Sequence, residues 1–165
     1  MGLFSTKIEL VAPFSGELVD ITSVEDITFS QKMLGDGVAI IPKDGKLLAP
    51  ADGKIVQLFH TKHAIGMDIK GIELLIHVGM NTVELNGEGF TAHVVEGDRV
   101  KKGDLLLEVD LELLKEKGYP IETPLVITNM EVVKELKKHQ GQVNAGKSPI
   151  MNIVKWFISR DLVIE

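Results

Sequence analysis

The sequence contains no cysteine, and only one tryptophan and one tyrosine stand among its 165 residues. Without cysteine the chain can form no disulfide, no thiolate nucleophile and no zinc ribbon. No apolar run approaches the roughly 20 residues that a membrane-spanning helix needs. The N-terminus also lacks the basic start and long apolar run of a signal peptide. We therefore expect a cytoplasmic protein with no membrane span.

Positive charge is also scarce, because 24 acidic residues outnumber 18 Lys and Arg and give a net charge of −6. Nucleic acid would be repelled by such a chain, whereas a basic partner protein would be attracted. Hydrophobic residues make up 44% of the chain, and 16 glycines accompany many Val, Ile and Leu. This composition favours β structure with many turns.

A repeat organises the first third of the chain: LVAPFSGELVDI at residues 10–21 recurs as LLAPADGKIVQL at residues 47–58. Each copy has the pattern of a strand, Ala-Pro, a turn with Gly and a second strand, so we predict two related hairpins. Pro13 and Pro50 cannot donate to a ladder and belong at strand ends. More strands are predicted at residues 37–42, 64–71, 72–78 and 123–129. Residues 97–112 are predicted to hold two Gly-Asp turns around a short strand, followed by a longer strand.

Helix signals are few. LELLKEKG at residues 111–118 predicts one or two helical turns that end at Gly118, and NMEVVKELKKHQG at residues 129–141 fits a helix with an Asn cap. The second segment fits a turn followed by an exposed strand equally well. We expect one domain over residues 1–165, with an extra C-terminal tail at about 156–165 that adds packing or frays.

The strand at residues 72–78 carries a histidine where burial is expected. By the period-two rule, one face holds Ile72, Leu74, Ile76 and Val78, and the other holds Glu73, Leu75 and His77. The apolar face is complete without the imidazole. His77 is therefore predicted to project from the opposite face of a rigid strand. His93 and His139 are predicted to be ordinary histidines, either exposed at the surface or hydrogen-bonded within the protein, without a functional role.

A second histidine is predicted to lie beside His77. If FHTKH stays extended, Phe59, Thr61 and His63 share a face. A tight hairpin turning at Lys70 would make His63 and His77 near cross-strand neighbours, with Cβ atoms about 5 Å apart. The two imidazoles would then face each other, with the Thr61 hydroxyl close by.

Three chemistries compete for two facing imidazoles. A usual zinc site needs at least three protein ligands, and only Glu73 or His60 could add one here. Hydrolysis would need a serine triad or nucleophile elbow, which is not visible. Phosphoryl transfer needs one imidazole as nucleophile and a second as N–H donor, with a hydroxyl fixing the tautomer of the second ring. The alternative is that both are surface histidines without a chemical function.

Five segments together resemble the glucose-type IIA domain of the bacterial phosphoenolpyruvate-dependent sugar phosphotransferase system. They are LGDGVAIIP at 34–42, APADGKI at 49–55, HTKHA at 60–64, LLIHVGMNTVELNGEGF at 74–90 and EGDRVKKGD at 96–104. The likeness runs from about Ile8 to about Ile153. It implies an all-β, antiparallel sandwich or barrel-like fold with short helical turns.

The resemblance also implies a cytoplasmic phosphocarrier without cofactor. The carrier protein HPr would donate a phosphoryl group to His77 Nε2, and a cysteine of a IIB domain would receive it for sugar uptake. His63 matches the partner histidine and Thr61 the hydroxyl that orients it. No obligatory metal is implied, although His63 and His77 could hold zinc with a ligand from a partner.

The expected docking surface surrounds this pair. Its members are an acidic rim residue, Asp26, and an apolar collar that excludes water: Phe29, Phe59, Leu75 and Val83. Asn81 stands where the family often has Asp, so electrostatic attraction of a basic HPr should be weaker. The C-terminal residues from about Trp156 to Glu165 have no counterpart.

Three other readings stay open. VEGDRVKKGDLLLEVD resembles a hairpin of lipoyl or biotinyl carriers, but no Met-Lys-Met or Asp-Lys-Ala tip is found, although Lys62 and Lys70 lie near turns. A zinc peptidase would need a His-x-His pair, and the LIHVG segment offers one histidine. A regulator that binds transporters or kinases according to its phosphorylation state is compatible with the carrier.

Overall fold

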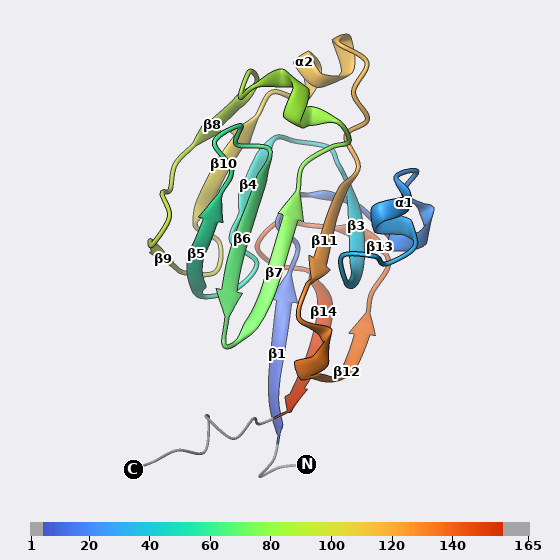
Figure 1. The fold of residues 1–165 in the computed structure, drawn as a ribbon, viewed down its shortest axis with the longest axis vertical. Coiled ribbons are helices and arrows are strands. Elements are labelled where there is room, and N and C mark those ends of the chain that lie inside the picture. The colour runs from blue at the N-terminus through green and yellow to red at the C-terminus, as the bar shows by residue number, and fades with distance from the viewer. Residues whose placement is uncertain (1–4, 157–165) are drawn as a thin grey trace.

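Three antiparallel sheets build the fold in the computed structural model, which describes residues 5–156 (Figure 1). The largest sheet has eight strands in the order β13 (Gly141–Val143), β2 (Gly16–Asp20), β3 (Asp36–Pro42), β11 (Thr123–Ile127), β7 (Ile72–His77), β6 (Ala64–Ile69), β5 (Gly53–Leu58) and β9 (Arg99–Val100). The second sheet contains β1 (Ser5–Val11), β14 (Pro149–Trp156) and β12 (Val133–Lys138), and the third contains β4 (Lys46–Leu48), β10 (Leu105–Val109) and β8 (Phe90–Ala92). The all-β antiparallel prediction is confirmed.

Apolar side chains from all three sheets meet in one main core. Its fully buried members include Leu10, Phe14, Leu18, Ile40, Leu47 and Ile55. Strand β7 shows why the sequence folds this way, because its alternate residues Ile72, Leu74 and Ile76 are buried and the residues between them are not. No helix within residues 5–156 is long and apolar enough to cross a membrane.

The repeated segments are not hairpins, and this prediction was wrong. Strand β1 pairs with β14, whereas β2 pairs with β3 and β13; likewise β4 pairs with β10, whereas β5 pairs with β6 and β9. Each Ala-Pro is instead a corner where the chain leaves one sheet for another. The two corners bind each other, because Val11 N donates to Pro50 O and Leu48 N donates to Pro13 O, both at 2.9 Å.

The short helices cap the sheets. They are α1 (Ile27–Ser30), α2 (Leu111–Glu116) and the 3-10 turns η2 (Ile21–Ser23), η3 (Thr82–Leu85) and η4 (Met130–Val132). The turns predicted at residues 111–118 are confirmed by α2, whose Asp110 side chain accepts from Leu113 N. Residues 129–141 form η4 and the strand β12 rather than a helix, since β12 completes its ladder on β14. Of the predicted tail, only Trp156 lies within the described residues, as the last residue of β14.

Candidate functional site

The two predicted histidines lie at one end of the hairpin formed by β6 and β7. The hairpin turns at Lys70 and Gly71, and its register places Ala64, not His63, opposite His77. The predicted register was therefore wrong by one residue. His63 lies opposite Val78, whose N–H donates to the His63 carbonyl at 2.7 Å.

A bent loop before β6 determines the direction in which the His63 side chain points. Residues 59–63 are not extended as predicted, because Lys62 has a left-handed φ of 62° and its N–H donates to Phe59 O at 2.7 Å. This turn brings the imidazole of His63 onto the face of His77. The two ring centroids are 4.9 Å apart, with the ring planes at 83°.

One ring nitrogen of each histidine is engaged by the protein. His77 Nδ1 lies 2.8 Å from the carbonyl oxygen of Gly79, which can only accept, so Nδ1 carries the proton and Nε2 keeps a lone pair. His63 Nδ1 lies 2.7 Å from the hydroxyl of Thr61, which is 5% exposed. Thr61, His63 and His77 are therefore brought together as the sequence predicted.

Burial keeps both imidazoles neutral near pH 7. The pKa of His63 falls to about 4, first because the ring is buried and then because His77 and His60 oppose its positive charge. The pKa of His77 is also lowered by burial, although the Gly79 carbonyl and the Asp26 carboxylate act in the opposite direction. A neutral imidazole with an available Nε2 is a nucleophile.

Aromatic side chains line the histidine pair. The Phe29 ring lies 5.1 Å from His77, and the Phe59 ring lies 5.5 Å from His63, both as centroid distances. Asp26 is the N-cap of α1 and accepts from Thr28 N at 2.8 Å, and its carboxylate is near enough to favour the charged form of His77. Leu75 lies on β7 two residues before His77, on the same side of the strand.

The remaining predicted rim residues lie on the segment that follows β7. Asn81 has a left-handed φ of 62° and its side chain makes no capping hydrogen bond, while Val83 on η3 is 49% exposed. Two further rim residues were not predicted: Ile27 and Met33, which flank Phe29 and are 60% and 66% exposed. The signal available in the sequence was two large apolar residues shortly after an N-cap candidate, Asp26, because a helix as short as α1 cannot bury all of its side chains.

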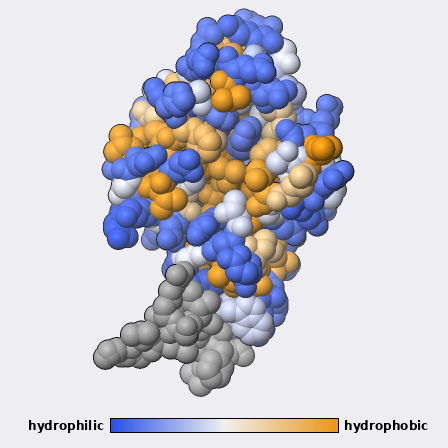
Figure 2. Space-filling model, in the orientation of Figure 1, coloured by the Kyte–Doolittle hydropathy of each residue, from blue (hydrophilic) through white to orange (hydrophobic). Residues whose placement is uncertain are grey.

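A hollow of about 340 Å³, which was not predicted, lies on the outer face of β5, β6 and β7 and is lined by Val56, Phe59, Gly66 and Leu75 among others. Gly66 lacks a side chain opposite Leu75, which leaves this space. Figure 2 shows apolar surface spreading across this face of the molecule with a polar rim. The hollow therefore extends the apolar surface beside the histidines.

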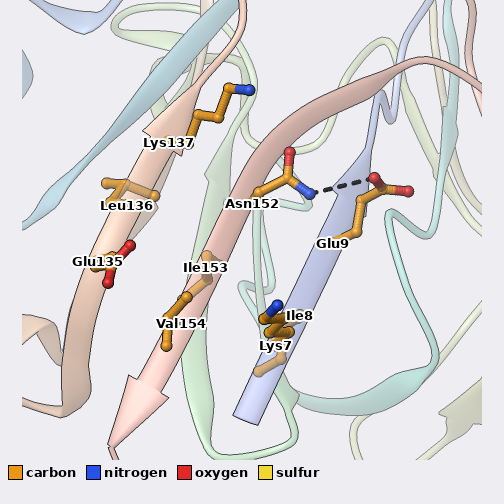
Figure 3. Close-up of a pocket in the computed structure, with 9 residues that line it drawn as sticks. All are labelled: Lys7, Ile8, Glu9, Glu135, Leu136, Lys137, Asn152, Ile153 and Val154. Carbon is orange, nitrogen blue, oxygen red and sulfur yellow. Dashed lines mark hydrogen bonds between the residues drawn. The ribbon is translucent and has the colours of Figure 1, made fainter. Parts of the chain in front are cut away.

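A different hollow lies on the sheet of β1, β14 and β12 (Figure 3). Its lining includes no histidine or hydroxyl nucleophile, and its Asn152 side chain donates to Glu9 at 3.2 Å. Among residues 5–156, no three His, Asp or Glu side chains meet in a way that could hold a metal ion. The histidine pair is therefore the candidate functional site.

Known proteins resemble this chain over most of its length. A 51% identical protein of Halalkalibacterium halodurans, named PTS system glucose-specific EIIA component, matches over 152 residues, which cover 90% of this chain and 88% of that protein. A Haemophilus influenzae protein of the same name is 46% identical over 92% of both chains. A glucosamine-specific EIICBA component of Bacillus subtilis is 54% identical over 120 residues, which are 72% of this chain but 19% of that protein.

The structure and a family model agree with these matches. The glucose permease IIA of Mycoplasma capricolum superposes with a TM-score of 0.84 at 38% identity, covering 89% of this chain and 96% of that one. The family described as phosphoenolpyruvate-dependent sugar phosphotransferase system, EIIA 1, matches residues 8–133. The chain belongs to this EIIA family of the sugar phosphotransferase system.

Proposed function

We propose that this chain is a phosphocarrier in which His77 Nε2 accepts a phosphoryl group from HPr and passes it to a cysteine of a IIB domain. The observation that carries the proposal is the hydrogen bond from His77 Nδ1 to Gly79 O, at 2.8 Å. It leaves Nε2 as the nucleophilic atom beside a second neutral imidazole. The relatives named glucose-specific make glucose the first sugar to test.

The transfer exchanges one bond for another at phosphorus. The bond between phosphorus and the donor histidine of HPr breaks as the bond to His77 Nε2 forms, and the electron pair stays on the donor imidazole. In the second step the Nε2–P bond breaks as the IIB thiolate attacks. The proton on His77 Nδ1 stays in place throughout, held by Gly79 O.

His63 holds the phosphoryl group between the two steps. If the Thr61 hydroxyl donates to His63 Nδ1, the proton of His63 sits on Nε2. That N–H can donate to a phosphoryl oxygen on the neighbouring His77, whose ring centroid is 4.9 Å away. The added group carries about 1.5 to 2 negative charges. A neutral donor stabilises this charge without trapping it, as a carrier requires.

The apolar surroundings serve docking and protection. Phe29 and Phe59 against the two rings exclude water from a phosphoimidazole that would otherwise hydrolyse. The exposed Ile27, Met33 and Val83 provide apolar contacts for both partner proteins. HPr and the IIB domain would dock in turn, since both must reach the same Nε2.

The test is phosphorylation of the purified protein by phosphoenolpyruvate, enzyme I and HPr. We expect an acid-labile, base-stable phosphate on the wild type, none on His77→Gln, and a retained label that is not passed on by His63→Gln. His93→Gln is the matched control, because His93 is bonded to Glu108 on the exposed surface. An unlabelled wild type with active HPr would overturn the proposal.

A further inference from the structure

A groove of about 710 Å³ lies at the other end of the large sheet, where β9, β5 and β6 meet. Its charged lining consists of Lys54, Lys70, Arg99 and Lys101, with Asp52 and Asp68 among them. Asp68 is five residues along the strand direction from His63, which corresponds to about 17 Å. In Figure 1 this is the lower end of β6, where the turn to β7 is. Strand β7 ends at the opposite, upper end, and His77 is its last residue.

The cations in this groove repel one another. Lys54 and Arg99 are directly opposite on neighbouring strands, and like charges in that position destabilise a sheet. None of the four forms an ion pair with another residue of the described range 5–156, although the chain has a net charge of −6. Lys54 also lies opposite Asp68 on β6, so the carboxylates offset part of this charge. The groove nevertheless has four cations to two carboxylates, on a chain whose net charge is −6.

The turn at Lys70 adds a cation at a conformational cost. Lys70 has a left-handed φ of 52° and Gly71 a φ of 89°, in a two-residue hairpin loop. Asn, Asp and Gly are the residues that favour the first of these positions. The turn is also held in place, because Asn129 donates to Gly71 O and accepts from Glu73 N, both at 2.9 Å.

The two carboxylates give the groove hydrogen-bond acceptors as well. Asp52 Oδ1 accepts from Lys102 N and Asp68 Oδ1 accepts from Gly71 N, both at 2.8 Å, so each is fixed by the backbone and keeps its second oxygen. A bare anion would gain nothing from these oxygens. A ligand with a phosphate for the cations and hydroxyl groups for the carboxylates would use both kinds of side chain.

We propose that this groove binds a sugar phosphate, with the phosphate between Lys54 and Arg99 and the hydroxyl groups on Asp52 and Asp68. An anionic lipid surface fits less well, because the two carboxylates would face its phosphates. The binding uses neither histidine of the phosphocarrier site. Its test therefore stands or fails independently of phosphoryl transfer.

The experiment is an amide NMR titration of the full chain with glucose phosphate, esterified at the terminal hydroxymethyl carbon. We expect saturable shifts at Lys54, Asp68, Lys70 and Arg99, weaker at high salt. The double variant K54Q/R99Q should bind at least tenfold more weakly. The control K115Q/K147Q loses the same charge at exposed positions elsewhere and should bind as the wild type does.

Titrations with glucose, inorganic phosphate and vesicles of phosphatidylglycerol in phosphatidylcholine complete the test. Tighter binding of glucose phosphate than of either glucose or inorganic phosphate supports the proposal. Equal affinity for inorganic phosphate, binding to vesicles without binding to glucose phosphate, or equal losses in both double variants overturns it. So does the absence of shifts at millimolar glucose phosphate.

Discussion

At the scale of single residues, two different groups bind the Nδ1 atoms of the histidine pair. A backbone carbonyl, which can only accept, sets His77, whereas a hydroxyl, which can donate or accept, binds His63. The nucleophile therefore has one fixed tautomer, and the donor ring depends on the orientation of Thr61. This asymmetry matches the roles proposed for the two rings, since an attacking nitrogen must never carry the proton.

The low pKa of His63 predicts a pH-dependent stability. The folded ring takes up a proton at about 4, whereas the unfolded ring does so at its ordinary value of 6.5. Acid therefore protonates the unfolded state first, and the free energy of unfolding should fall as pH drops from about 6.5 towards 4. His63→Gln should flatten this fall, measured by urea unfolding at several pH values.

Ring-proton NMR gives the direct check. We expect the His63 Cε1–H resonance to titrate with a midpoint near 4. A midpoint near 6.5, or a variant that loses stability in acid as steeply as the wild type, would contradict the burial of a neutral ring.

The sequence was enough to place His77 but not His63. The alternation of Ile72, Leu74 and Ile76 fixes which face His77 occupies, because strand periodicity is a local rule. The direction of His63 depends on a left-handed φ at Lys62, which a lysine rarely adopts and no pattern announces. The two imidazoles are neighbours as predicted, although the strand register differs by one residue. The bent loop at Lys62 turns the His63 ring back towards His77 and so compensates for the shifted register.

At the scale of elements, Gly66 on β6 controls the hollow beside the histidines. A Cβ there would meet Gln57 at 3.4 Å and Val56 at 3.7 Å, which are tolerable contacts, and the backbone φ is not left-handed. Gly66→Val should therefore fold, while its side chain fills space between Phe59 and Leu75. We expect KM for HPr to rise several-fold with kcat nearly unchanged, measured by initial rates of phosphorylation.

A matched change at Gln142 tests whether the hollow itself matters. Gln142→Val replaces an exposed polar side chain on β13, at the opposite edge of the large sheet, and Gln142 does not line the hollow. Its KM should stay near the wild-type value. If Gly66→Val leaves KM unchanged while folding normally, the hollow takes no part in docking.

The boundaries of helices and strands could be predicted where local sequence signals agreed with one another. Which strands pair with each other could not be predicted from such signals. Asp110 and Gly118 mark α2 from both ends, and the strands around His77 follow from alternation. The Ala-Pro segments looked like hairpins because hairpins are the commonest short connection. Their hydrogen-bond partners are remote in the sequence: Ala12 bonds to Ser148 and Ala49 to Asp104. No local sequence pattern indicates such distant partners. The same remoteness left β12 open between a helix and an exposed strand, because its partner β14 is distant in the sequence.

At the scale of the whole molecule, one ion pair ties the small sheet to the large one. Lys138 at the end of β12 reaches Asp36 at the start of β3, with Nζ 2.6 Å from Oδ1 and both side chains 24% exposed. The same oxygen accepts from Gly37 N at 2.8 Å. The contact joins residues 102 positions apart, so it forms only when both sheets are in place.

Removing the Lys138 ammonium group should weaken the contact between the two sheets and lower the free energy of unfolding. Lys138→Met keeps the aliphatic stem but leaves the half-buried Asp36 carboxylate without its closest cation, since Lys32 lies at 3.7 Å. We expect a loss of about 1–2 kcal/mol in the free energy of unfolding, measured by urea unfolding. This is somewhat less than the roughly 1.5–3 kcal/mol of a buried charged hydrogen bond, because both side chains are partly exposed and Asp36 keeps Lys32 nearby. Lys137→Met, at an exposed position on the same strand, should change it by less than about 0.5 kcal/mol. Equal losses in both variants would mean that β12 tolerates no methionine, and that the ion pair does not hold the sheets together.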